Sequence, residues 1–141
     1  MIRQRAGALV GCVLAVCVLA GCTSARSELG TSDSSCFLAI PTAAQAVGPH
    51  SRLLGVRLLT LASLRQEAPG LAADLPSEGL SRDRICVLAF AGSFTTRSVA
   101  KPVGLSTGPV AVVVAKSPSN RLIATVIVRR PPLHFGHSHF G

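Results

Sequence analysis

Residues 109–128 read PVAVVVAKSPSNRLIATVIV, and this stretch sets the expected architecture. Two runs rich in Val and Ile, 109–115 and 121–128, flank the five residues KSPSN, whose Ser, Pro and Asn are typical of turns. β-Branched runs separated by such a turn predict an antiparallel β-hairpin. Because both runs are apolar on each face, we expect helices and neighbouring strands to cover the hairpin on both sides.

Two further segments are candidate strands. The run ICVLAF, residues 85–90, is almost entirely apolar and is bounded by charge and by Gly92, which is typical of a buried strand. Residues 52–64, RLLGVRLLTLASL, fit two patterns: alternate positions from 56 to 62 suit a strand, whereas positions 56, 59 and 63 suit one face of a helix. We favour a strand that ends at Thr60.

Short helices are expected around these strands. Pro41 suits the first turn of a helix, and PTAAQAV then runs to Gly48, a typical helix end. Ser63 and Gln66 have the spacing of a capping box, which predicts a helical turn there, and residues 68–84 read mostly as connection. The sequence therefore predicts a small α+β domain: an antiparallel sheet with a C-terminal hairpin, one or two short helices and one disulfide.

The order of helix, strand and hairpin over residues 38–128 is loosely similar to PepSY-type domains. That resemblance implies a helix packed on a small antiparallel sheet. It brings no diagnostic motif with it, so it adds to the expected fold and not to the expected chemistry.

The N-terminal residues have the composition of an export signal. Arg3 and Arg5 precede an uncharged stretch, residues 6–25, whose most apolar part ends at Ala20. That apolar part is shorter than the roughly 20 residues that span a bilayer. We therefore expect cleavage of the segment and not its retention as a membrane helix.

The tetrapeptide Leu19-Ala20-Gly21-Cys22 resembles the lipobox of bacterial lipoproteins. The resemblance implies that the Cys22 thiol receives a diacylglyceryl group carrying chains such as palmitate, and that cleavage after Gly21 makes Cys22 the first mature residue. Two acyl chains hold a protein firmly to a bilayer, whereas one binds marginally. The alternatives are an ordinary cleaved signal and an uncleaved anchor.

The predicted lipidation site divides the chain into three parts. Residues 1–21 are expected to be the lipoprotein signal peptide, and residues 22–35 the lipidated Cys22 with a flexible linker rich in Ser, Thr and Gly. Residues 36–141 are expected to form a single domain with a His-containing C-terminal tail. The resemblance places the domain at the outer face of the bacterial cytoplasmic membrane, or elsewhere in the cell envelope, held by its lipid.

The five cysteines leave one possible bridge in the mature chain. Cys12 and Cys17 leave with the signal peptide and Cys22 is modified, so only Cys36 and Cys86 remain as thiols. Export favours their oxidation, and we predict a Cys36–Cys86 disulfide. The alternative is two separate buried thiols.

Positive charge dominates the second half of the chain. The formal net charge is +8, and no Asp or Glu follows Asp83. A field of one sign attracts lipid headgroups or anionic wall polymers, whereas the absence of Trp and Tyr argues against nucleic acid. The alternative is a solvated basic face. The residues expected to bind an anionic surface are Arg84, Arg97, Lys101, Lys116, Arg121, Arg129 and Arg130.

The C-terminal HFGHSHFG predicts a second kind of site. His134, His137 and His139 are close in sequence, and neutral imidazole is a good ligand for zinc, copper or nickel. His50 could supply a fourth ligand if the fold brings it near. The alternative is an exposed tail whose Phe135 and Phe140 pack on the sheet edge or touch a membrane.

Catalysis is not expected from this sequence. GLSTG, residues 104–108, matches the G-x-S-x-G pattern of a hydrolase nucleophile elbow, which needs a strand before it and a helix after it. Here a Val-rich strand follows, so Ser106 is expected in a turn. We therefore expect a non-enzymatic binding or accessory module without cofactor, whose partner is the membrane, an envelope protein or an anionic wall polymer. The alternative is a transition-metal scavenger or sensor.

Overall fold

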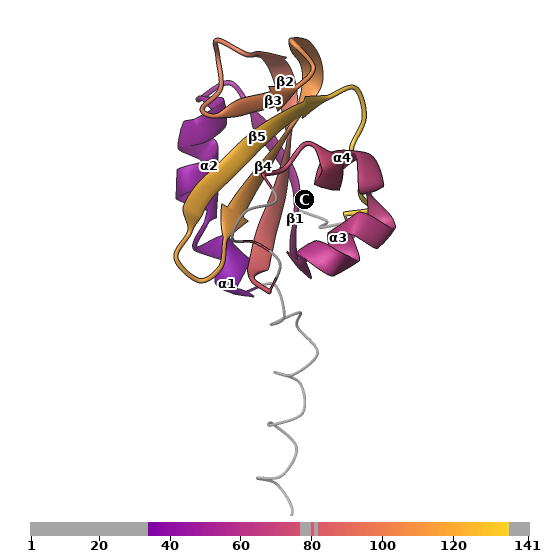
Figure 1. Ribbon diagram of the computed structural model, residues 1–141. Coiled ribbons are helices and arrows are strands. Elements are labelled where there is room, and N and C mark those ends of the chain that lie inside the picture. The colour runs from indigo at the N-terminus through magenta and orange to yellow at the C-terminus, as the bar shows by residue number, and fades with distance from the viewer. Residues whose placement is uncertain (1–33, 77–79, 81, 136–141) are drawn as a thin grey trace, which may run out of the picture. The chain divides into compact units, whose positions relative to one another are not determined.

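A computed structural model describes residues 34–76, 80 and 82–135 and confirms the α+β class (Figure 1). The strands form one sheet in the order β1-β2-β4-β5-β3. Neighbours among β1, β2, β4 and β5 are antiparallel, whereas β3 runs parallel to β5, so one edge of the sheet is mixed. The elements are α1 (Ser34–Phe37), α2 (Ile40–Val47), β1 (Arg52–Thr60), α3 (Leu61–Glu67), α4 (Pro69–Ala73), β2 (Arg84–Thr95), β3 (Pro102–Gly104), β4 (Thr107–Lys116) and β5 (Arg121–Val128).

The predicted C-terminal hairpin is confirmed as β4 and β5. Their pairing runs from Val110 opposite Val128 to Lys116 opposite Arg121. Asn120 closes the turn with a positive φ of 56°, a conformation that Asn adopts more readily than most side chains. Its N–H donates to the carbonyl oxygen of Lys116 at 2.8 Å. The turn residues thus set the register in which the two Val-rich runs meet.

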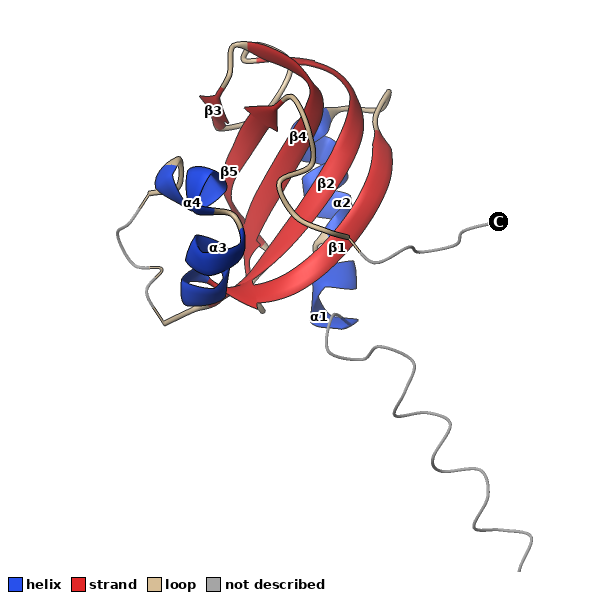
Figure 2. Ribbon diagram, turned by 90° about the vertical axis from the view of Figure 1, so that its right-hand side faces the viewer, coloured by secondary structure: helices blue, strands red, loops and turns tan. Residues whose placement is uncertain are grey.

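Both faces of the sheet are buried, as expected from its apolar strands. Side chains alternate between the faces of a strand, so successive valines of β4 serve two different cores. Figure 2 shows α3 and α4 on one side of the sheet and α1 and α2 on the other. The first core contains Val112, Val114 and Val126 with Leu61, Leu64 and Leu71, and the second contains Leu88, Val113 and Ile127 with Ala43 and Val47.

The ambiguous segment 52–64 is a strand followed directly by a helix. β1 ends at Thr60, as favoured, and pairs along its length with β2. The predicted capping box at Ser63 is wrong, because Thr60 is the N-cap of α3 and its hydroxyl accepts the Ser63 N–H at 3.1 Å. The extended backbone of the strand's last residue already suits an N-cap.

The described part of the chain contains more helix than expected, because α4 occupies part of the predicted connection. Pro69 stands in its first turn, where a missing N–H costs nothing. Pro69 therefore starts a helix here instead of only ending one. With α1, a single turn before α2, the described helices number four and not one or two.

Among the described residues, two buried side-chain oxygens have no hydrogen-bond partner: Asn120 Oδ1 in the β4–β5 turn and Thr125 Oγ1 in the core. Thr125 of β5 is fully buried, and its Oγ1 has no hydrogen-bond partner in the described structure. A buried hydroxyl without a partner retains its desolvation penalty. We expect Thr125→Val, which keeps the shape, to raise the free energy of unfolding by about 1–2 kcal/mol in denaturant titrations. Thr125→Ser, the control, keeps the hydroxyl and loses a methyl, so it should destabilise. A less stable Thr125→Val would contradict this account.

Candidate functional site

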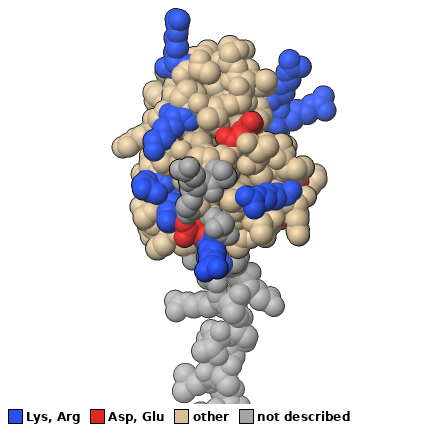
Figure 3. All heavy atoms as spheres, in the orientation of Figure 1, with Lys and Arg blue, Asp and Glu red and all other residues tan. Residues whose placement is uncertain are grey.

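The seven basic residues predicted to bind an anionic surface do not form one patch. Arg84 begins β2, Lys116 ends β4 and Arg121 begins β5, so these three lie at one end of the sheet. Arg97, Arg129 and Arg130 follow the far ends of β2 and β5 and lie at the opposite end. Figure 3 shows Lys and Arg side chains dispersed around the visible face. Six of the seven residues therefore fall into two separate groups, one at each end of the sheet.

Lys101 belongs to neither group. It precedes β3 at the edge of the sheet, and its Nζ donates to the carbonyl oxygen of Leu122 at 2.9 Å. Its carbonyl oxygen accepts the Thr125 N–H at 2.9 Å. Both the side chain and the carbonyl oxygen of Lys101 thus form hydrogen bonds with β5. In this structure Lys101 attaches the short strand β3 to β5 at the edge of the sheet.

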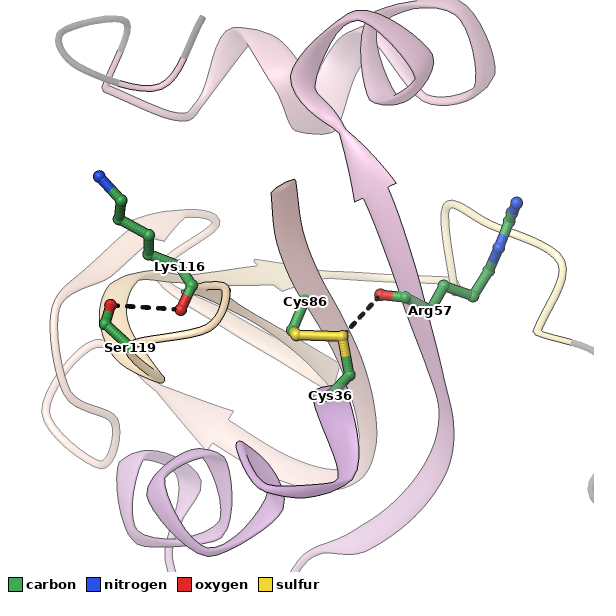
Figure 4. Close-up of a disulfide and its surroundings, with 5 residues drawn as sticks. All are labelled: Cys36, Arg57, Cys86, Lys116 and Ser119. Carbon is green, nitrogen blue, oxygen red and sulfur yellow. Dashed lines mark hydrogen bonds between the residues drawn. A yellow bond between two sulfur atoms is a disulfide. The ribbon is translucent and has the colours of Figure 1, made fainter. Parts of the chain in front are cut away.

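The predicted disulfide is confirmed and fixes the position of α1 (Figure 4). Cys36 of α1 and Cys86 of β2 are fully buried, with their sulfurs 2.07 Å and their Cα atoms 5.3 Å apart. The Cys36 sulfur also lies 3.8 Å from the carbonyl oxygen of Arg57. Because a bridged sulfur has no proton to donate, we interpret this contact as packing.

The disulfide brings α1 to one particular end of the sheet. Cys86 stands opposite Ala115 in the β2–β4 register, next to the pair formed by Ile85 and Lys116. α1 therefore lies at the end where β2 begins, β4 ends and β5 begins. We call this region, with Phe37, Leu38, Arg84, Lys116 and Arg121, the α1 end.

Two apolar side chains are exposed at the α1 end. Phe37 is 51% exposed and Leu38 is 70% exposed, whereas Cys36 and Ala39 on either side are fully buried. Residues three apart share one face of a helical turn, so the buried pair directs the two residues between them outward. The remaining exposed large hydrophobic residue among those described, Leu105 at 39%, lies between β3 and β4 at the opposite end.

Charges at the α1 end are partly neutralised. Lys116 Nζ lies 2.8 Å from Asp83 Oδ2, and the two side chains are each 31% exposed. Within the described residues, Arg84 and Arg121 are exposed and form no ion pair. The α1 end therefore offers two arginines to an anionic partner, beside an apolar pair.

The segment around Ser106 does not have the context of a nucleophile elbow. Ser106 lies between β3 and β4, so a strand follows it, and its carbonyl oxygen accepts the Thr96 N–H at 3.1 Å.

A hollow of about 350 Å³ beside α3 and α4 has one ionisable side chain in its lining and no paired acid and base. Its lining residues are Arg65, Pro69, Ala72, Ala73 and Leu75.

The residues proposed as metal ligands are only partly described. His134 is exposed, His50 lies in an exposed turn before β1, and His137 and His139 lie outside the described residues, as does Cys22. The described residues include no group of three or more His, Cys, Asp or Glu side chains arranged to hold a metal. The metal site therefore stays a prediction from sequence.

The C-terminal segment that contains His134 crosses the sheet. Figure 2 shows the chain passing from the end of β5 to the neighbourhood of β1. Phe135 is half-buried in the first core, against Gly55 of β1, where any Cβ would overlap its side chain. For Phe135 this is the packing on the sheet edge that the sequence offered as the alternative to a metal-binding role, whereas Phe140 lies outside the described residues.

Among the described helices, none combines the length and the apolar character needed to cross a bilayer. No family model, curated protein or solved structure matches the chain.

Proposed function

We propose that this protein is an exported bacterial lipoprotein, anchored through acyl chains on Cys22, whose domain is a non-enzymatic binding or accessory module of the cell envelope. The observation that carries the proposal is the buried Cys36–Cys86 bridge, close in sequence to the lipobox-like Leu19–Cys22. Disulfides persist outside the cytoplasm, where reductants do not reverse them. The bridge and the N-terminal signal thus support the same compartment by independent chemistry.

The position of the bridge suits a tethered domain. α1 is a single helical turn, and a helix of that length is unstable without tertiary contacts. Cys36 links this turn to β2, which pairs with β1 on one side and β4 on the other. The described element nearest to the anchor along the chain is thereby held by an interior strand of the sheet.

Charge supports an anionic partner for the module. Arg97, Arg129 and Arg130 lie at the end of the sheet farther from α1, and all three are exposed. Positive charge concentrates anionic ligands near a surface without requiring a deep pocket. This distribution supports contacts with an anionic wall polymer or an acidic envelope protein at that end.

The anchor is tested by comparing the wild-type chain with Cys22→Ala in cells. We expect the wild type to incorporate labelled palmitate, to sediment with membranes and to begin at a modified Cys22 in mass spectrometry. Cys22→Ala should lose the label, because it removes the thiol that is predicted to accept the diacylglyceryl group. Crosslinking in intact membranes should recover a reproducible partner or polymer with the wild type.

Cys12→Ala is the matched control, because it removes a cysteine of the signal peptide and leaves the predicted lipidation site intact. Its labelling should equal that of the wild type. Wild-type protein without label, or equal labelling of Cys22→Ala, would overturn the anchor. A labelled protein that yields no reproducible crosslinked partner or polymer would overturn the binding role alone.

A further inference from the structure

We propose that the α1 end docks on an anionic lipid surface, with Phe37 and Leu38 inserted between headgroups and with Arg84 and Arg121 facing the phosphates. This inference rests on the lipid anchor proposed above, and it adds an orientation. The domain would lie against the bilayer through one defined end.

The apolar pair fits this partner. Phe37 and Leu38 are adjacent and are the two most exposed large hydrophobic side chains in the described part of the chain. The buried disulfide at Cys36 and the buried Ala39 prevent both from turning inward. Apolar side chains beside cationic ones are the composition of surfaces that lie in the membrane interface.

The length of the connection to the anchor restricts where this pair can be. Residues 23–33 join Cys22 to Ser34, and even a fully extended chain of that length reaches only about 40 Å. Phe37 and Leu38 follow within four residues of Ser34. If Cys22 is in the bilayer, the tether enters the domain at the α1 end and keeps that end within about 40 Å of the membrane.

The charges at the α1 end favour anionic lipid in particular. Lys116 forms an ion pair with Asp83, whereas Arg84 and Arg121 form no ion pair within the described residues. Cationic side chains near a membrane surface are attracted by anionic headgroups over about a Debye length. The two arginines therefore attract the α1 end to the bilayer. This is the same end that carries the apolar pair, which can enter the bilayer.

A tryptophan reporter tests the orientation. The chain contains no Trp and no Tyr, so Phe37→Trp introduces one fluorophore at an exposed position. The lipidated mature variant, which begins at Cys22, would be reconstituted in vesicles of phosphatidylglycerol and phosphatidylcholine with brominated acyl chains. We expect a blue-shifted emission and at least threefold stronger quenching by bromine than in the matched variant Leu105→Trp, whose exposed residue lies at the opposite end.

Charge reversal separates headgroup attraction from anchoring. In the Phe37→Trp protein, Arg84→Glu with Arg121→Glu should reduce quenching by half or more, as should vesicles without phosphatidylglycerol. Arg52→Glu with Arg65→Glu makes the same change in charge at two exposed arginines outside the α1 end and should leave quenching unchanged. Equal effects of the two pairs would overturn the assignment of a docking surface to the α1 end.

Two failures are distinguishable by mass spectrometry of the same preparation. If Cys22 carries no acyl chain, the anchor and this inference fall together. If Cys22 is acylated but the Phe37→Trp reporter is quenched no more than Leu105→Trp, the anchor stands and the membrane orientation is wrong. In that case the exposed pair faces a partner other than lipid.

Discussion

Loss of the Cys36–Cys86 bridge is expected to lower the free energy of unfolding by about 4 kcal/mol. The two cysteines are separated by 50 positions, and closing a loop of this length removes that much chain entropy from the unfolded state. A domain of this size has a total stability of about 5–15 kcal/mol. The bridge thus accounts for a large fraction of the margin that keeps the domain folded.

Guanidinium titration of the wild type and of Cys36→Ala with Cys86→Ala measures this effect. Dithiothreitol should shift the wild-type midpoint toward that of the double variant and leave the double variant unchanged. Hydrogen exchange should show α1 losing protection before β2 and β4, because α1 has one turn and β2 is paired on both sides. A wild-type midpoint that does not respond to reductant would contradict the account.

The parts of the fold that depend on neighbouring residues were predictable from the sequence. The β4–β5 hairpin follows from two Val-rich runs and a turn. The bridge joins residues 50 positions apart, and it was predictable for a different reason: the expected loss of three other cysteines left one pair. The parallel pairing of β3 was not predictable, because it depends on where β5 lies after the hairpin forms. The contact of Phe135 with Gly55 is equally remote in sequence.

The candidate site was only partly predictable for a related reason. The sequence shows Arg121 and Arg129 only as two basic residues. In the structure Arg121 begins β5 and Arg129 follows its end, so the two lie at opposite ends of the sheet. The total positive charge is visible in the sequence, but its division between two ends requires the direction of each strand. Phe37 and Leu38 were missed, although an apolar pair directly after a polar linker and a cysteine was an available signal.

A core substitution in α3 should destabilise nearly as much as loss of the bridge. Leu64 is fully buried in the core that joins α3 and α4 to the sheet. Leu64→Ala removes apolar surface and leaves a cavity, which together cost about 2–5 kcal/mol in well-packed cores. We expect a lower midpoint in guanidinium titrations, without loss of the disulfide. A change below about 0.5 kcal/mol would mean that α3 and α4 are not part of the cooperative unit.

The same substitution at Leu38 is the matched control, and it separates folding from membrane contact. Leu38 is 70% exposed, so Leu38→Ala should change stability by less than about 0.5 kcal/mol. If the α1 end inserts into lipid, Leu38→Ala should nevertheless weaken the quenching of the Phe37→Trp reporter, whereas Leu64→Ala in its folded state should not. If Leu38→Ala weakens quenching but not stability, while Leu64→Ala weakens stability but not quenching, then Leu38 contributes to membrane binding without contributing to folding. Matching losses of stability and quenching at Leu38 would instead assign it to the domain core.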